Sequence, residues 1–180
     1  MSKPILMPTK PIRAMQPAVT LAEIQTAMGR VRDSIYLSPC ARSENFSQLT
    51  GNSVYLKLDN LQRTGAFKER GALNKLLTLT ADERSRGVIA ASAGNHAQGV
   101  AYHAGKHGIR AQICMPLTTP LIKVSATKSY GAEVILHGAN YDEACEEAVR
   151  RSQQFGMTFV HPFDDEVVID SRRSLRDQRN

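Results

Sequence analysis

The segment SAGNHAQG at residues 92–99 combines residue types that can bind an anion. Ser92 supplies a hydroxyl group, and Gly94 leaves the neighbouring backbone N–H groups accessible. Asn95 and His96 add side-chain donors. If a helix starts here, its free N–H groups and its dipole favour a carboxylate or a phosphate. The same residue types also suit ordinary helix capping, so the segment alone leaves both roles open.

This segment does not match the common nucleotide-binding loops. It contains no G-x-G-x-x-G pattern. Gly94 and Gly99 have the separation of the two glycines in a P-loop, but Val100 stands where that loop requires lysine. We therefore do not expect a nucleotide at this turn.

A second chemical candidate is Lys68, in the segment LQRTGAFKERGA at residues 61–72. We expect it in the first turn of a helix, where the positive end of the helix dipole disfavours an ammonium group. The same field lowers the pKa of an amine and favours the neutral, nucleophilic form that imine chemistry needs. Because most lysines are solvated surface groups, position alone does not decide between the two interpretations.

The histidines and cysteines indicate no metal site. His103 and His107 are four residues apart on an expected helix, but no carboxylate or cysteine follows at ligand spacing, so we expect two solvated imidazoles. The chain has an odd number of cysteines, and these lie far apart in the sequence, at Cys40, Cys114 and Cys145. They suggest a reducing compartment, with Cys114 in an apolar core run.

The elements that must position these residues follow from periodicity. Residues 21–36 have the apolar period of a helix, with Thr20 as its N-cap, and residues 53–60 alternate like a strand. Residues 67–79 are helix-like, and Gly65 permits a tight turn before them.

Four short apolar runs begin at residues 87, 109, 132 and 157, and helical stretches fill the gaps at about 95–107, 120–130 and 140–155. Strand–helix–strand units at this spacing predict a three-layer α/β fold with a Rossmann-like parallel sheet. The nearly continuous apolar character of the strands fits a sheet covered on both faces.

The charge distribution and the composition argue against nucleic-acid binding and membrane insertion. Of the formal net charge of +6, residues 1–13 and residues 171–180 each contribute +3, so the folded part is neutral. Tryptophan is absent, and aromatic residues make up 6% of the chain, which disfavours a nucleic-acid surface built on base stacking. No run approaches the roughly 20 apolar residues of a membrane span. We expect a cytoplasmic protein that binds neither nucleic acid nor membrane.

Four segments together resemble the threonine dehydratase (threonine ammonia-lyase) family. These are QRTGAFKERGA, SAGNHAQGVA, KVSATKSYGAEVILHG and FVHPFDD, and they follow the order and spacing of that family over roughly residues 20–166. The family has the fold of the type II pyridoxal-phosphate (PLP) enzymes, related to the tryptophan synthase β subunit. Serine racemase-like and cysteine synthase-like enzymes belong to the same group.

The resemblance implies a role for each matched position in the PLP site. Lys68 matches the lysine that forms a Schiff base with PLP, and Phe67 lies beside it against the cofactor. Asn95 matches the residue that hydrogen-bonds the ring oxygen of the cofactor. Ala93 stands where racemase-like relatives have a serine that handles a proton, which favours elimination over racemisation.

The substrate site is implied in the same way. Ser92, Gly94, Asn95 and His96 match the loop that holds the substrate carboxylate. The implied reaction is deamination of L-threonine to 2-oxobutanoate and ammonia, or of L-serine to pyruvate. The full-length family also implies a homo-oligomer.

The resemblance also implies a division into parts. We expect a Pro-rich N-terminus (1–18), the first piece of a large domain (19–60), a small Rossmann-like domain (61–160) and a return to the large domain (161–180). The ending SRRSLRDQRN resembles nothing in the family, and no glycine follows Gly156 to supply its glycine-rich phosphate loop. We therefore expect a truncated chain that binds PLP weakly and turns over little substrate.

Three alternatives remain open from sequence. The chain could be an inactive fragment that acts as a binding or interaction module. It could also be a serine racemase-like or a cysteine synthase-like enzyme, the latter disfavoured by the SAGNHAQG loop.

Overall fold

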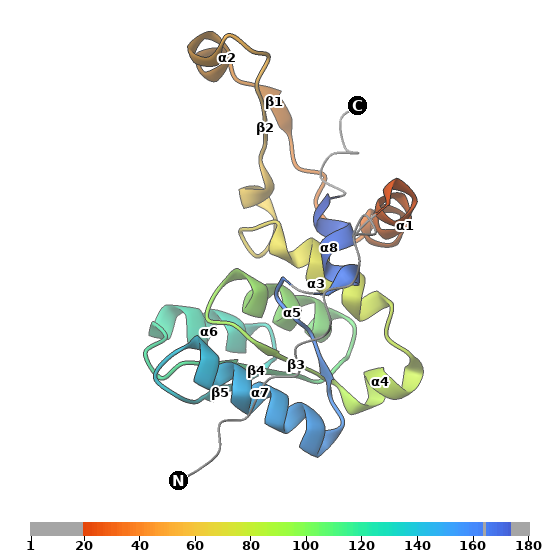
Figure 1. Cartoon of the computed structure of the whole chain (residues 1–180), viewed down its shortest axis with the longest axis vertical. Coiled ribbons are helices and arrows are strands. Elements are labelled where there is room, and N and C mark those ends of the chain that lie inside the picture. The colour runs from red at the N-terminus through yellow and green to blue at the C-terminus, as the bar shows by residue number, and fades with distance from the viewer. Residues whose placement is uncertain (1–19, 164, 174–180) are drawn as a thin grey trace, which may run out of the picture.

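The computed structural model describes residues 20–163 and 165–173 of the chain. Its centre is a four-stranded parallel sheet (Figure 1). In spatial order the strands are β5 (Glu133–Leu136), β4 (Ala111–Met115), β3 (Val88–Ala91) and β6 (Thr158–Phe159). The parallel sheet predicted from the four apolar runs is confirmed.

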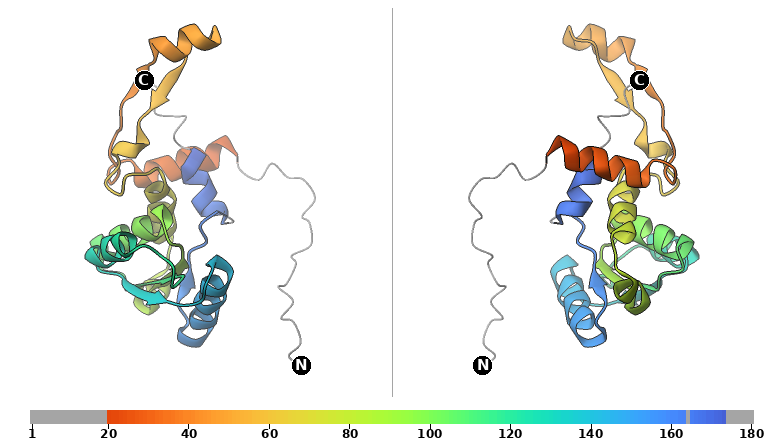
Figure 2. Two further views of the ribbon diagram at one scale, coloured as in Figure 1. Left: turned by 90° about the vertical axis from the view of Figure 1, so that its left-hand side faces the viewer. Right: turned by 90° about the vertical axis from the view of Figure 1, so that its right-hand side faces the viewer.

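Helices cover both faces of this sheet, which gives the predicted three layers. The helices that follow the strands are α5 (Asn95–Lys106), α6 (Leu121–Ser129) and α7 (Tyr141–Phe155). Figure 2 shows the green and teal helices α5 and α6 on one side of the sheet and the blue helix α7 on the other.

The sheet has a separate hydrophobic core on each face, and alternate residues of β3 pack into one or the other. Val88 and Ala90 pack with residues of α5 and α6, whereas Ile89 and Ala91 pack with residues of α7. All four side chains are fully buried. A strand with both faces buried reads as a continuous apolar run, which explains why the sequence showed no polar alternation here.

An arm formed by residues 38–58 projects from this body (Figures 1 and 2). It consists of β1 (Cys40–Arg42), α2 (Glu44–Thr50) and β2 (Tyr55–Lys57), and the two strands pair antiparallel. The sequence predicted a longer strand at 53–60 and missed β1 and α2. Strands of three residues with exposed side chains carry too few positions for a periodic signal.

The N-terminal helix α1 (Leu21–Val31) begins where predicted but ends five residues earlier. Thr20 caps it in a capping box with Glu23. Beyond Val31 the chain turns, and Ile35 is buried in the same cluster as Val31 and Leu73.

Helix α3 (Lys68–Leu77) lies between α1, α5 and the last described helix, α8 (Glu166–Arg173) (Figure 1). Buried Asn74 joins three elements: it accepts from Arg30 Nε at 2.7 Å and donates to the Val167 carbonyl at 2.7 Å. Lys75 pairs with Asp165 at 2.8 Å. Two short helices, η1 (Asp59–Leu61) and α4 (Ala81–Arg86), precede and follow α3.

Helix α8 forms the last described element of the chain, and residues 171–173 continue its backbone. Residues 174–180 and the expected Pro-rich segment 1–18 lie outside the described residues. None of the helices in the described part of the chain has the length and apolar character that a membrane crossing requires.

Helices α3 and α5 approach each other closely at Gly99. A Cβ added there would lie 3.1 Å from the Cα of Glu69, tighter than ordinary van der Waals contact. The close approach brings the first turn of α3 against the second turn of α5.

We expect Gly99→Ala to lower the free energy of unfolding by about 1–3 kcal/mol, because the methyl group would push two backbones apart. The matched control is Gly29→Ala in α1, where an added Cβ meets nothing within 4 Å. That exposed helical site should gain up to about 1 kcal/mol. Urea denaturation measures both values, and equal changes in the two variants would contradict the packing described here.

Candidate functional site

Lys68 is the first residue of α3, which confirms the predicted place in the first turn of a helix. Its half-buried side chain extends to the Pro162 carbonyl oxygen, to which Nζ donates a hydrogen bond at 2.9 Å. Phe67 is the N-cap residue, and its ring centroid lies 5.9 Å from the same Nζ. Gly65 adopts φ +72°, the left-handed conformation that the predicted tight turn requires.

The loop 92–95 leaves β3 and enters α5. Gly94 is the N-cap residue, and no side chain caps the helix. Ser92 Oγ accepts the Gly94 N–H at 3.2 Å, which draws the loop into a tight turn. Asn95 is exposed. A helix start without a side-chain cap can offer its N–H groups to an external anion.

His96 takes a different place from the one expected. Its imidazole is 2% exposed, and Nε2 lies 3.0 Å from the Val160 carbonyl. Because a carbonyl can only accept, Nε2 carries the hydrogen. The side chain therefore fastens the start of α5 to the end of β6. The sequence could not reveal this, because the partner is a backbone atom 64 residues away.

The segment 160–162 connects the two predicted motifs. The Val160 carbonyl contacts His96, and two residues later the Pro162 carbonyl accepts from Lys68. The contact between Glu69 and Gly99 brings α3 and α5 together from the other side. The predicted lysine and the predicted anion loop are thus tied to one short stretch of backbone at the carboxyl edge of the sheet, where parallel α/β sheets bind ligands.

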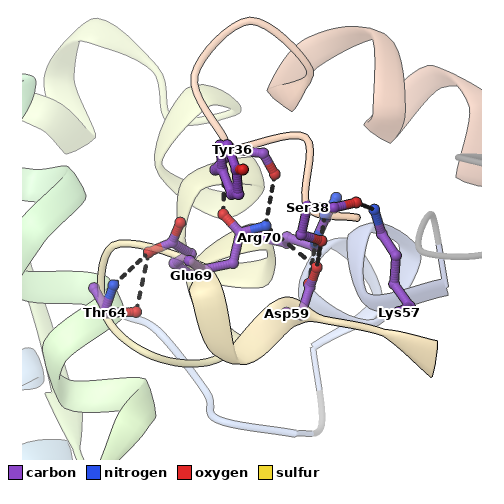
Figure 3. A network of polar contacts seen from close by, with 8 residues as sticks. Tyr36, Ser38, Lys57, Asp59, Thr64, Glu69 and Arg70 are labelled. Carbon is purple, nitrogen blue, oxygen red and sulfur yellow. Dashed lines mark hydrogen bonds and ion pairs between the residues drawn. The ribbon is translucent and has the colours of Figure 1, made fainter. Parts of the chain in front are cut away.

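A buried ion pair holds the segment that leads to Lys68 (Figure 3). Arg70 Nε donates to Asp59 Oδ2 at 2.7 Å, and Arg70 Nη2 donates to Asp59 Oδ1 at 3.1 Å. Both side chains are almost fully buried. This bidentate pair joins η1 to the first turn of α3 and closes the intervening loop.

The same carboxylate accepts two more hydrogen bonds. Ser38 Oγ donates at 2.6 Å and Gln62 Nε2 at 3.2 Å. Gln62 also bonds the backbone of Tyr36 in both directions. Figure 3 shows how the loop is thereby joined to residues 36–38 at the base of the arm.

The pKa of Asp59 reflects this environment. Burial alone would raise it, but the hydrogen bonds and the charge of Arg70, with the bonds from Ser38 and Gln62, outweigh burial and lower it. Asp59 therefore stays ionised at neutral pH. The pair was not predicted from the sequence, because nothing in the spacing of one acidic and one basic residue indicates that both are buried.

His103 corrects another expectation. It was expected as a solvated imidazole, but it is fully buried, whereas His107 is half-buried. Neither ring nitrogen of His103 has a hydrogen-bond partner among the described residues. Burial, followed by the charges of His107 and Lys106, lowers its pKa to about 3. The residue is therefore a neutral core side chain of α5.

Known proteins that are similar to this chain include enzymes that depend on pyridoxal phosphate. Residues 31–176 match the family model described as pyridoxal-phosphate dependent enzyme. The chain is 49% identical over 151 residues to L-threonine ammonia-lyase of Thermotoga maritima, covering 84% of this chain and 38% of that protein.

Two solved structures are similar in fold. The processed form of threonine deaminase isoform 2 from Solanum lycopersicum gives a TM-score of 0.81 at 35% identity, covering 98% of this chain and 50% of that one. Maize serine racemase gives a TM-score of 0.85 at 29% identity, with 89% and 49% covered. The chain thus spans half or less of the length of these relatives.

The ion pair predicts a large loss of stability for Asp59→Ala. Removing the carboxylate leaves the Arg70 charge buried, so the free energy of unfolding should fall by about 3–5 kcal/mol. Asp33→Ala is the control, since the Asp33 side chain is 91% exposed. It should change stability by about 0.5 kcal/mol or less. If urea denaturation gave similar values for both variants, the pair would not hold the loop.

Because His103 is buried as a neutral side chain, we expect the folded protein to lose stability in acid. The folded-state pKa of this histidine, about 3, lies below the ordinary value of 6.5, so the unfolded chain binds the proton first and stability falls as pH drops below 6.5. The loss from this group should be about 3 kcal/mol at pH 4. His103→Leu should remove that part of the slope in denaturation curves measured from pH 7 to pH 4. A variant with the unaltered slope would show that the imidazole is solvated.

Proposed function

The chain belongs to the family of pyridoxal-phosphate-dependent enzymes, and from this premise we propose that it carries the cofactor on Lys68 and is of the threonine/serine dehydratase type. The substrates would be L-threonine, deaminated to 2-oxobutanoate and ammonia, and L-serine, deaminated to pyruvate. The observation that carries the proposal is the position of Lys68: its amine begins α3 and donates to Pro162, in the segment that also receives His96.

The residues present fit pyridoxal phosphate at its aldehyde end and its ring. The Lys68 amine is a half-buried nucleophile at a helix start, which is the donor that an aldehyde requires. Phe67, next to it, would contact the ring. The exposed amide of Asn95 would donate to the ring oxygen. No glycine follows Gly156, so a glycine-rich phosphate loop is not part of this fit.

The start of α5 suits the substrate carboxylate. Its backbone N–H groups and the Ser92 hydroxyl would hold the carboxylate beside Gly94, which has no side chain to block it, and so orient the α-carbon toward Lys68. The bond from His96 to Val160 supports this role by fixing the first turn of the helix.

Lys68 would also move the proton. Bound pyridoxal phosphate withdraws the negative charge that forms at a substrate α-carbon. Lys68 Nζ, when neutral, would accept the α-proton and later return a proton. The Pro162 carbonyl supports this role because its hydrogen bond orients Nζ.

Elimination is favoured over racemisation by Ala93. Racemisation needs a second acid/base group on the opposite face, and alanine cannot supply one. The relative at 49% identity is named for ammonia-lyase activity, whereas the serine racemase is 29% identical. A test on this chain is to incubate it with PLP and L-serine and to compare the two products, since the sequence predicts little turnover: pyruvate without D-serine supports a dehydratase, and D-serine would favour a racemase.

Further parts of the proposal rest on sequence and family. We infer that the division at residues 60 and 160 separates a small domain from the large one. It is supported by the parallel sheet, whose strands all lie within 88–159. We infer also a cytoplasmic location, homo-oligomeric assembly, and a role in either isoleucine biosynthesis or threonine catabolism.

The direct test is covalent trapping of the cofactor. After incubation with PLP and reduction with borohydride, peptide mass mapping should find the pyridoxyl adduct at Lys68, and Lys68→Ala should lower total incorporation at least about tenfold. Lys106→Ala, which removes an exposed lysine of α5, should leave it unchanged. Adduct spread evenly over exposed lysines, with Lys68 unmodified, would refute the proposal.

A further inference from the structure

Glu69 is a fully buried carboxyl group directly after Lys68 in the first turn of α3. Its Oε2 accepts two hydrogen bonds from Thr64, one from the backbone N–H and one from Oγ1, both at 3.0 Å (Figure 3). Within the described part of the chain, Oε1 has no hydrogen-bond partner. The side chain therefore reaches back from the helix to the residue that precedes the Gly65 turn.

This contact spans the turn that delivers Lys68. Thr64 lies before Gly65 and Glu69 lies after Lys68, so the carboxyl group closes a small loop of backbone around the turn. Thr64 is itself buried. The backbone of Glu69 also packs against Gly99 of α5, so the carboxyl group is confined between the loop and the neighbouring helix.

Stability alone does not explain a glutamate at this position. Burial raises its pKa, although the bonds from Thr64 and the backbone of Arg63 and the charge of Arg70 act against that rise. An ionisable group buried with one oxygen unbonded weakens the fold relative to a neutral residue of the same shape. Such groups gather beside functional sites, and here the adjacent residue is Lys68.

We propose that Glu69 is a positioning residue for Lys68: by accepting both donors of Thr64 it fixes the turn that aims the lysine amine at the Pro162 carbonyl. It acts through Thr64 and Gly65 and does not touch the reacting groups. The inference rests on the proposed role of Lys68 as the cofactor-bearing residue.

The test compares Glu69→Leu, which removes the acceptor, with Glu69→Gln, which keeps an acceptor for Thr64 without the charge. Two readouts are taken on the full chain. Reductive methylation with formaldehyde and cyanoborohydride, read by peptide mass, compares the accessibility of Lys68 with that of exposed Lys106 in the absence of cofactor. Borohydride trapping with PLP measures the amount of pyridoxyl adduct at Lys68, which depends on the orientation of the lysine amine.

In Glu69→Leu, methylation of Lys68 relative to Lys106 should rise about threefold or more, because the amine is released from Pro162. PLP trapping at Lys68 should fall about tenfold. In Glu69→Gln both values should stay within about twofold of the unaltered chain. The inference is overturned if Glu69→Leu behaves as the unaltered chain does, or if Glu69→Gln fails as fully as Glu69→Leu.

A second variant covers loss of folding. If circular dichroism shows that Glu69→Leu is unfolded, Thr64→Val removes one of the two hydrogen bonds from the other side and should shift both readouts in the same direction. If neither the methylation ratio nor PLP trapping at Lys68 changed in Thr64→Val, the inference would be overturned. The proposed function is judged separately: an unaltered chain that traps no PLP at Lys68 refutes the function, while the methylation ratio still reports on Glu69.

Discussion

The buried pair between Asp59 and Arg70 is the interaction on which the candidate site depends. It fastens the beginning of the loop, at η1, to the first turn of α3, where the loop ends. Between these two points lie the Gly65 turn and Lys68. Two ions taken out of water this completely stabilise a fold only when their hydrogen bonds are satisfied, and Ser38 and Gln62 complete the set around the carboxylate.

The sheet supplies the second half of the site. Because β3 and β6 are parallel neighbours, the loop 92–95 that follows β3 and the segment 160–162 that follows β6 leave the same edge. The carbonyls of that segment then receive His96 from α5 and Lys68 from α3. The Gly65 turn thus sets the direction of Lys68, and the topology of the sheet brings the loop 92–95 close to it.

Much of this scaffold could be predicted from the sequence, and the omissions have physical causes. The runs that became β3 and β4 were recognisable because both faces are buried, and the start of α3 was recognisable from Gly65 and the helical stripe after it. The arm was largely missed, since its strands have three residues each. The inward turn of His96 depends on a backbone atom 64 residues away. The burial of His103 and of the Asp59–Arg70 pair depends on how the elements pack together, which composition and periodicity do not encode.

The most direct measurement of the central claim is a crystal structure of the chain after reduction with PLP. The account predicts that Asp59 and Arg70 remain paired and buried, and that the pyridoxyl group on Lys68 lies beside the Asn95 amide and the start of α5. A structure in which the modified Lys68 points into solvent away from that loop, with Asp59 and Arg70 apart, would contradict it.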